Sequence, residues 1–286
     1  MNVSAGLTVT AMQEIETGNF ASPRWVLCPP SSVQVVNWNI NRGLQLQRVI
    51  DFLASAKADL ILLQEADINA RRTHRLDIAR EIAQKLQLNY VFGREFQELT
   101  QGVRGSPAYH GQATLSRWPL SNSRVLRFRK QSNFWRPRWF LPEIDPFQER
   151  IGGRLALVSE ANIAGKTIVT YNLHLESKGD DGLRGSQLDE TLEDVRKYSS
   201  DMRILLAGDL NLDVTGGQAA AALSRAQFQD ALANYHAATT PDSFLQDGRI
   251  IDWIFTRGPI SASQSDVHRC VSASDHYPLS TTLAFV

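Results

Sequence analysis

The feature that most constrains the fold is an alternation of strand-like and helix-like segments from residue 33 to the C-terminus. Residues 33–40 alternate apolar and polar side chains and are rich in β-branched residues, which predicts a strand. Residues 46–53 carry apolar side chains at helical spacing, and residues 59–65 form a short apolar run with a polar end, typical of a buried strand. Neither a linker nor an internal repeat interrupts the pattern. We therefore expect one α/β domain.

The same patterns predict the remaining elements. Helices are expected at 72–86 and around 188–195, and strands at 89–92, 113–115, 125–128, 155–160, 167–173, 204–207, 250–255 and 279–285. Residues 1–32 lack sustained periodicity and contain Gly, Ser and Pro, so we expect an N-terminal extension ahead of a folded domain at 33–286.

Charge and composition exclude several classes of protein. The 30 basic and 30 acidic side chains balance, so binding to nucleic acid or to an anionic membrane requires a local patch. No apolar stretch approaches the roughly 18 residues of a membrane span. The N-terminus shows no basic start followed by an apolar core, so we expect no secretory signal and a cytoplasmic protein. The 2 cysteines form no zinc or disulfide pattern.

Polar side chains that could bind a metal ion or take part in catalysis lie at the ends of the expected strands. They are Asn39, Gln64, Glu65, His174, Asp209, Asn211, Asp252, Asp275 and His276. Residues at strand ends converge at one rim of a sheet, where α/β folds commonly place their sites. Carboxylate and amide oxygens suit Mg²⁺, or Mn²⁺, rather than zinc. The histidines add donors for phosphate oxygens and acid–base capacity near neutral pH.

These segments resemble the endonuclease/exonuclease/phosphatase superfamily, which includes DNase I, exonuclease III, neutral sphingomyelinases and inositol polyphosphate 5-phosphatases. Single motifs of this kind are weak, but together they follow the family's order over most of the chain. The matching segments are Trp38-Asn39-Ile40, Leu63-Gln64-Glu65, residues 110–119, Asn172-Leu173-His174-Leu175, Gly208-Asp209-Leu210-Asn211, Ile251-Asp252-Trp253-Ile254 and Ser274-Asp275-His276.

The resemblance implies a four-layer α/β sandwich, in which two mixed sheets pack together with helices outside. It also implies a metal site. Glu65 would be the main ligand of Mg²⁺, with Asn39 nearby and Asp275 as a second contact. A divalent cation supplies Lewis acidity and stabilises the leaving oxygen during attack on an anionic phosphodiester.

The resemblance further implies roles in hydrolysis for five side chains. Asp209 would orient or deprotonate the attacking water, helped by Asn211. His276, paired with Asp252, would contact the phosphate or transfer a proton, and His174 would donate to a non-bridging phosphate oxygen. Preorganised donors of this kind stabilise the charge that develops on phosphate oxygens.

Several residues to which the resemblance assigns no role are expected to be non-catalytic. We expect surface or core histidines, and arginines on a solvated helix face: His74, His110, His236 and His268, and Arg72 and Arg75. In the segment 110–119, Gln112 stands where many family members have Asn after the glycine.

A basic and aromatic segment at 124–154 is a candidate for binding the substrate. It holds eight basic and three acidic side chains, a net charge of +5 in a neutral chain. Arginines pair with phosphates and aromatic rings stack on unpaired bases, so Trp135, Arg136 and Arg138 are candidate substrate-binding residues. The same composition suits a lipid interface if Trp135 and Trp139 are exposed. A third interpretation is that the aromatic rings only cover the core.

Together these features predict a Mg²⁺-dependent phosphodiesterase, with a nuclease acting on DNA or RNA as the leading interpretation. A phospholipid phosphodiesterase of the sphingomyelinase type or an inositol polyphosphate phosphatase remains an alternative. A catalytically inactive binding module is a third class, and the complete set of acidic residues argues against it. We expect a monomer.

Overall fold

The computed structural model describes residues 14–22, 30–136, 138, 142, 148–233, 237–243 and 247–286. Within these residues, the first sheet has eight strands: β1 (Ile15–Asn19), β4 (Asn89–Val103), β5 (Ser106–Ser116), β3 (Leu60–Ile68), β2 (Ser32–Arg42), β14 (Leu279–Phe285) and β13 (Ile260–Val267) in spatial order, with β7 (Arg150–Gly152) beside β4. The second sheet has six described strands: β11 (Gln229–Asp230), β12 (Asp252–Arg257), β10 (Arg203–Asp209), β9 (Lys166–His174), β8 (Leu155–Ile163) and β6 (Leu120–Arg127). Each sheet contains a parallel pair, β2 with β3 and β9 with β10, among antiparallel neighbours.

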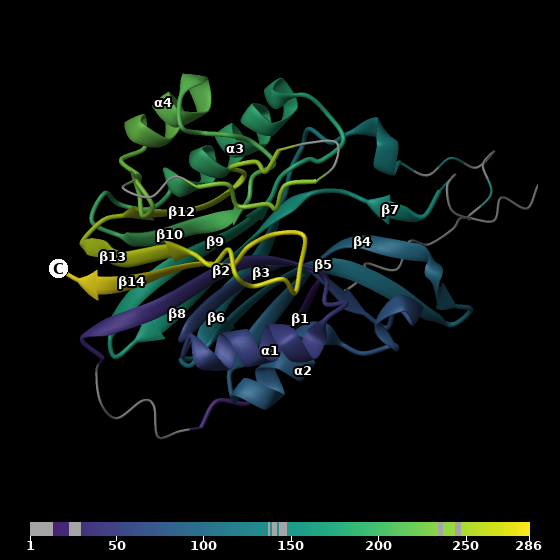
Figure 1. Cartoon of the computed structure of the whole chain (residues 1–286). Helices are drawn as coiled ribbons and strands as arrows, with labels where there is room; N and C mark the ends of the chain where they lie inside the picture. Colours follow the sequence, from purple (N-terminus) through teal and green to yellow (C-terminus); the bar gives the residue numbers. More distant parts are fainter. Residues whose placement is uncertain are drawn as a thin grey trace, which may run out of the picture.

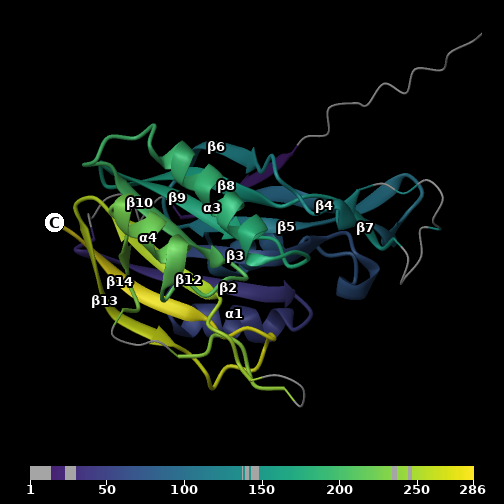
Figure 2. The same ribbon diagram turned by 90° about the horizontal axis from the view of Figure 1, so that it is seen from above.

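The sheets pack face to face between two layers of helices (Figure 1). Helices α1 (Leu46–Ser55) and α2 (Ile78–Leu86) cover the outer face of the first sheet, and α3 (Asp181–Val195) and α4 (Gly217–Arg225) cover that of the second. Figure 2 shows α3 and α4 lying across the second sheet from above. The expected four-layer α/β sandwich is therefore confirmed. None of the described helices has the length and apolar character needed to span a membrane.

Strand alternation divides the apolar residues between an inner core and two outer cores. In β2, Val33 and Val35 join the core between the sheets, whereas Val36, Trp38 and Ile40 pack towards α1 and α2. This follows from the period of two in a strand, which sends neighbouring side chains to opposite faces. The burial of apolar surface on both faces of each sheet stabilises the layered arrangement.

Several predicted boundaries are wrong. The helix expected at 72–86 begins only at Ile78, after a side-chain cap from Asp77, and Arg71–Thr73 forms a separate 3₁₀ turn, η2. Strands β4 and β5 run further than expected and form a long hairpin. Helix α4 and strand β13 were not predicted.

The N-terminal segment also contributes to the sheet. Strand β1, within the expected extension 1–32, pairs antiparallel with β4 from Ile15 opposite Gly93 to Asn19 opposite Asn89. The sequence of β1 shows no clear strand pattern. Its extended conformation depends on its hydrogen bonds to β4, so the local sequence did not predict it.

Candidate active site

Polar side chains replace apolar ones at one end of the space between the sheets. On β2 the inward stripe runs from Val33 and Val35 to Asn37 and Asn39, and on β9 it ends at His174. The inward stripes of the other strands end at Gln64 of β3, Asp209 of β10 and Asp252 of β12. The strand-end residues singled out in the sequence therefore converge, because they follow the inner core at the same end of both sheets.

A buried amide network joins the two sheets beneath this end. The Nε2 atom of Gln64 donates to the side-chain oxygens of Asn37, at 2.9 Å, and of Asn172 in the opposite sheet, at 2.7 Å. Asn172 in turn donates to the backbone oxygens of Leu63 and Ala113. Nδ2 of Asn37 and Oε1 of Gln64 are buried without a hydrogen-bond partner among the described residues. The hydrogen bonds from Gln64 and Asn172 nevertheless link the two sheets next to the site.

His276 and Asp252 form a buried pair. Nδ1 of His276 lies 2.8 Å from Oδ2 of Asp252, and that oxygen also accepts a 2.7 Å hydrogen bond from Thr239. Burial alone would lower the pKa of His276, but the carboxylates of Asp252 and Asp209 outweigh it and raise this pKa to about 10. His276 is therefore a cation at neutral pH, with Nε2 on the side of Asp209.

Asp209 lies at the centre of the cluster. Its Oδ2 accepts a hydrogen bond from Asn39 at 3.1 Å, and its Oδ1 accepts one from the backbone of Asn211 at 2.9 Å. Oδ2 also lies 3.7 Å from Nε2 of His174 and 3.8 Å from Nε2 of His276. Asn211, which has a left-handed backbone, donates through its side chain to the oxygen of Leu175. These contacts fix the carboxylate between two histidine rings.

Glu65 projects from a bulge in β3. The β3–β5 ladder shifts register between Leu63 and Ala66, and Glu65 has a left-handed φ of 56°. Burial would raise the pKa of its carboxyl, but positive charge from His110, His174, Arg42 and Arg154 holds this pKa well below its usual range. The carboxylate is therefore ionised.

Two residues missed by the sequence reasoning complete the surroundings of His174. Glu95 is fully buried, and its Oε2 lies 3.1 Å from Nδ1 of His174. Nη1 of Arg154 lies 3.3 Å from Oε1 of Glu95. Burial would raise the pKa of Glu95, but His174 and Arg154 lower it to about 2. Nη1 of Arg154 also lies 2.7 Å from Nδ1 and 2.9 Å from Nε2 of His174, so Glu95 and Arg154 together hold the ring.

His110 and Arg72, for which no such role was expected, also lie in a buried network. Nδ1 of His110 lies 2.9 Å from Oδ1 of Asp67, and Arg72 contacts both carboxylate oxygens of Asp67 at 2.7 and 2.8 Å. The side chain of Arg72 is only 19% exposed, so the expectation of a solvated helix face is wrong. His110 is a core histidine, as expected, but it lies next to the candidate site.

The sequence matches a known protein family over most of its length. The model of the endonuclease/exonuclease/phosphatase family matches residues 36–276. The chain belongs to this family. A comparison with curated proteins finds no significant match.

Solved structures of the endonuclease/exonuclease/phosphatase family share the fold. An endonuclease/exonuclease/phosphatase from Beutenbergia cavernae matches with a TM-score of 0.66 at 18% identity, covering 90% of this chain and 72% of the other. A family protein from Bacteroides thetaiotaomicron matches with a TM-score of 0.64 at 17% identity, covering 91% and 96%. Truncated TDP2 from Caenorhabditis elegans matches with a TM-score of 0.59 at 20% identity, covering 88% and 98%.

The donors of this family member fit a hard divalent cation. Within the described residues, the carboxylate of Glu65 accepts no hydrogen bond, and its nearest cationic atoms are those of His174 at 3.9 Å and Arg42 at 4.0 Å. Asp209, Asp252 and His276 place ligand atoms within 4.8 Å of one another, but His276 and Asp252 already bind each other. Glu65 is therefore the carboxylate best placed to accept a metal ion.

Asn39 and Asp275, the other expected ligands, have different hydrogen-bond partners. The side-chain oxygen of Asn39 accepts a hydrogen bond from the backbone of Asn41 at 3.1 Å, while its nitrogen donates to Asp209. Asp275 accepts a 3.2 Å hydrogen bond from the hydroxyl of Ser274, and its charge helps to raise the pKa of His276. Asp275 thus lies on the His276 side of the centre.

The basic segment differs from the sequence expectation at Trp135. This ring is 3% exposed, packs on Phe96 with centroids 5.0 Å apart and donates from Nε1 to Glu176 at 2.9 Å. At Trp135 the third interpretation holds, because the ring covers the core and its indole N–H binds a buried carboxylate; neither stacking on a base nor insertion into a lipid surface is open to this ring. Trp139 lies outside the described residues.

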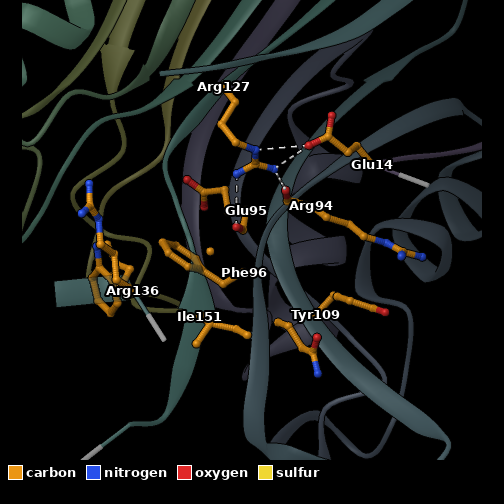
Figure 3. A pocket seen from close by; sticks show the side chains of 11 residues that line it. Glu14, Arg94, Glu95, Phe96, Tyr109, Arg127, Arg136 and Ile151 are labelled. Carbon is orange, nitrogen blue, oxygen red and sulfur yellow. Dashed lines mark hydrogen bonds and ion pairs between the residues drawn. The ribbon is translucent and has the colours of Figure 1, made fainter. Parts of the chain in front are cut away.

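Arg136 borders a hollow next to the site. The hollow has a volume of about 440 Å³, and Figure 3 shows Arg136 on one side of it and Arg127, bound to Glu14, on another. Its wall also includes the ring of Tyr109 and Glu95, whose carboxylate contacts His174. Aromatic rings and guanidinium groups therefore line a recess that adjoins the candidate site.

Proposed function

We propose that the protein is a Mg²⁺- or Mn²⁺-dependent phosphodiesterase that hydrolyses nucleic acid. The observation that carries this proposal is the position of Asp209, which is fixed by Asn39 and Asn211 and lies within 4 Å of both His174 and His276. A carboxylate between two nitrogen donors has the arrangement needed to align a water against a bound phosphate.

The side chains divide the chemistry among them. Asp209 orients the attacking water and accepts its proton. His276, kept cationic by Asp252, donates to a phosphate oxygen or to the leaving oxygen, and His174, held by Glu95, donates to a non-bridging oxygen. Glu65, with Asn39 and Asp275 nearby, would hold the metal ion, which when bound supplies Lewis acidity towards the phosphate.

Two features support nucleic acid as the substrate. Arg136 is exposed, and within the described part of the chain its guanidinium forms no ion pair, so its charge is available to a phosphate. The adjoining hollow presents the aromatic and cationic groups that bind bases and backbone. Both features lie beside the centre that would cut the backbone.

A phospholipid remains the second candidate because of Phe134. This ring is 44% exposed, and the cationic groups of Arg138 and Lys178 lie 5.6 and 5.5 Å from its centroid. An exposed apolar ring beside cations is a feature of proteins that bind anionic lipid surfaces. The same cations serve a nucleic acid equally well.

A substrate panel tests both candidates. Plasmid DNA, single-stranded DNA, RNA, sphingomyelin, an inositol polyphosphate and bis-p-nitrophenyl phosphate are each incubated with the protein in Mg²⁺, in Mn²⁺ and in EDTA. We expect metal-dependent cleavage of nucleic acid, with Glu65→Gln as the inactive control. Cleavage of sphingomyelin alone would move the assignment to the lipid class, and cleavage that persists in EDTA would contradict metal dependence.

A further inference from the structure

Glu65, the proposed metal ligand, has an unusual backbone that its neighbours must maintain. It lies in the bulge where the β3–β5 ladder is interrupted, with a left-handed φ of 56°. A non-glycine residue in this region costs free energy and persists only where the surrounding structure holds it. The ladder resumes directly after the bulge with Ala66 opposite Gly111 and Asp67 opposite His110.

The second pair after the bulge, Asp67 and His110, is cross-linked by side chains as well as by backbone. His110 and Asp67 are both fully buried, and the Nδ1–Oδ1 distance is 2.9 Å. Since the pKa of Asp67 is lowered by His110 and Arg72 against the opposing effect of burial, Asp67 is an acceptor and Nδ1 of His110 is the donor.

The cross-link extends to the edge of the site. Arg72 binds Asp67 through Nε and Nη2, and its Nη1 lies 3.1 Å from Oε2 of Glu98 on β4. Glu98 is buried, and its other oxygen lies 3.0 Å from Nε of Arg150 on β7. A chain of alternating charges therefore ties β3 to β4, β5 and β7 immediately beyond the bulge.

Among the described residues, Nε2 of His110 is a buried atom without a hydrogen-bond partner. His110 is close enough to Glu65 and Glu95 to help lower the pKa of both carboxyls, and at Glu65 its effect is the largest among the neighbouring basic groups. His110 is therefore a neighbour both of the proposed metal ligand and of the carboxylate that contacts His174.

We propose that His110 is a positioning residue, which, through its bond to Asp67 and Arg72, holds the Glu65 bulge in the geometry that binds the metal ion. This inference rests on the proposed function, because it gives His110 a role only if Glu65 binds a cation. Neighbours that orient a metal ligand typically change metal affinity by about 10- to 100-fold when they are removed.

Mn²⁺ binding to the metal-free protein tests this role without measuring activity. The fraction of free Mn²⁺ is followed by electron paramagnetic resonance for wild type and for His110→Ala, His110→Asn and Glu65→Gln, and each variant's thermal melting is recorded. We expect H110A to bind Mn²⁺ about tenfold more weakly. H110N should recover most of the affinity, because its amide N–H replaces Nδ1–H as the donor to Asp67. Glu65→Gln should lose the site.

Thr114→Val is the matched control. Thr114 lies on the same strand as His110 and is fully buried, and its hydroxyl has no hydrogen-bond partner in the described part of the chain. Its replacement by a side chain of equal shape should leave Mn²⁺ affinity unchanged. An equal loss of affinity in T114V and H110A would mean that any disturbance of β5 has this effect, and it would overturn the proposal.

The outcomes separate this proposal from the proposed function. H110A that melts at a lower temperature yet binds Mn²⁺ as wild type does would show a purely structural histidine and overturn the proposal alone. Wild type that binds no Mn²⁺ would overturn both. If H110A does not fold, Arg72→Lys tests the proposal instead. This substitution removes the bidentate hydrogen bonds to Asp67 at a position that is partly exposed. Severalfold weaker Mn²⁺ binding supports the proposal, and wild-type affinity refutes it.

Discussion

Nδ1 of His276 lies 2.8 Å from Oδ2 of Asp252, and the pair closes one side of the site at the inner end of β12. Oδ2 of Asp209 lies 3.8 Å from the other ring nitrogen of His276. Two carboxylates therefore face opposite nitrogens of one ring. This arrangement stabilises the imidazolium, so the charge to which we assign a catalytic role also affects the stability of the fold.

The first prediction follows from the raised pKa of His276. Its folded-state pKa of about 10 exceeds the ordinary value of 6.5, so its stabilising effect is fully present below pH 6.5 and is lost as the pH rises towards 10. The free energy of unfolding should fall over this window, by at most about 1.4 kcal/mol per pH unit from one group.

Urea unfolding at a series of pH values measures this slope. His276→Gln should flatten it, whereas the exposed His74→Asn should keep it. Equal slopes in wild type and H276Q would show that His276 does not carry the charge assigned to it.

The second prediction concerns the centre itself. Glu65→Gln, Asp209→Asn and His276→Ala should each lower metal-dependent hydrolysis by about 100-fold or more, because each removes a group that we propose contacts the reacting phosphate, the water or the metal ion. Turnover of bis-p-nitrophenyl phosphate measures the loss, and circular dichroism checks the fold. Glu193→Gln, whose side chain is 64% exposed on α3, is the control. Activity like that of wild type in any two of the three variants would refute the assignment.

The parts of the site predictable from the sequence are those at strand ends. Asn39, His174 and Asp209 each follow a short apolar run, and the alternation of a strand decides which face the last side chain takes. Parallel pairing of β9 with β10 then places Asp209 beside His174. Local pattern and one rule of sheet geometry were enough for these residues.

The residues missed depend on packing between distant segments. Glu95 lies within the 15-residue strand β4, with no local signal that separates it from Glu98, and it meets His174 only because the two sheets pack together. Arg72 was assigned to solvent because the helix was expected to begin there, whereas the chain forms a 3₁₀ turn that directs the guanidinium to Asp67. Neither contact follows from periodicity.

The third prediction tests whether Glu95 acts through His174. Glu95→Gln removes the carboxylate that orients the ring, 3.1 Å from Nδ1, and should lower kcat about tenfold with little change in KM. If the effect passes through the ring, the double variant Glu95→Gln/His174→Ala should be no slower than His174→Ala alone. A further tenfold loss in the double variant would show that Glu95 has a separate role.

The last prediction addresses the substrate. Reversing the charge of Arg136 and Arg138 should weaken binding of single-stranded DNA, measured by fluorescence anisotropy in EDTA so that no cleavage occurs. The slope of log affinity against log salt should fall by about 0.7 for each phosphate that the variant no longer neutralises, since each neutralised phosphate releases condensed counterions. Lys57→Glu/Lys85→Glu, which reverses two exposed charges by the outer helices α1 and α2, should change the slope little because those residues lie on another layer. If the two double variants have equal slopes, Arg136 and Arg138 do not bind the backbone. The phospholipid then becomes the better candidate, because a single headgroup needs no row of phosphate-binding cations.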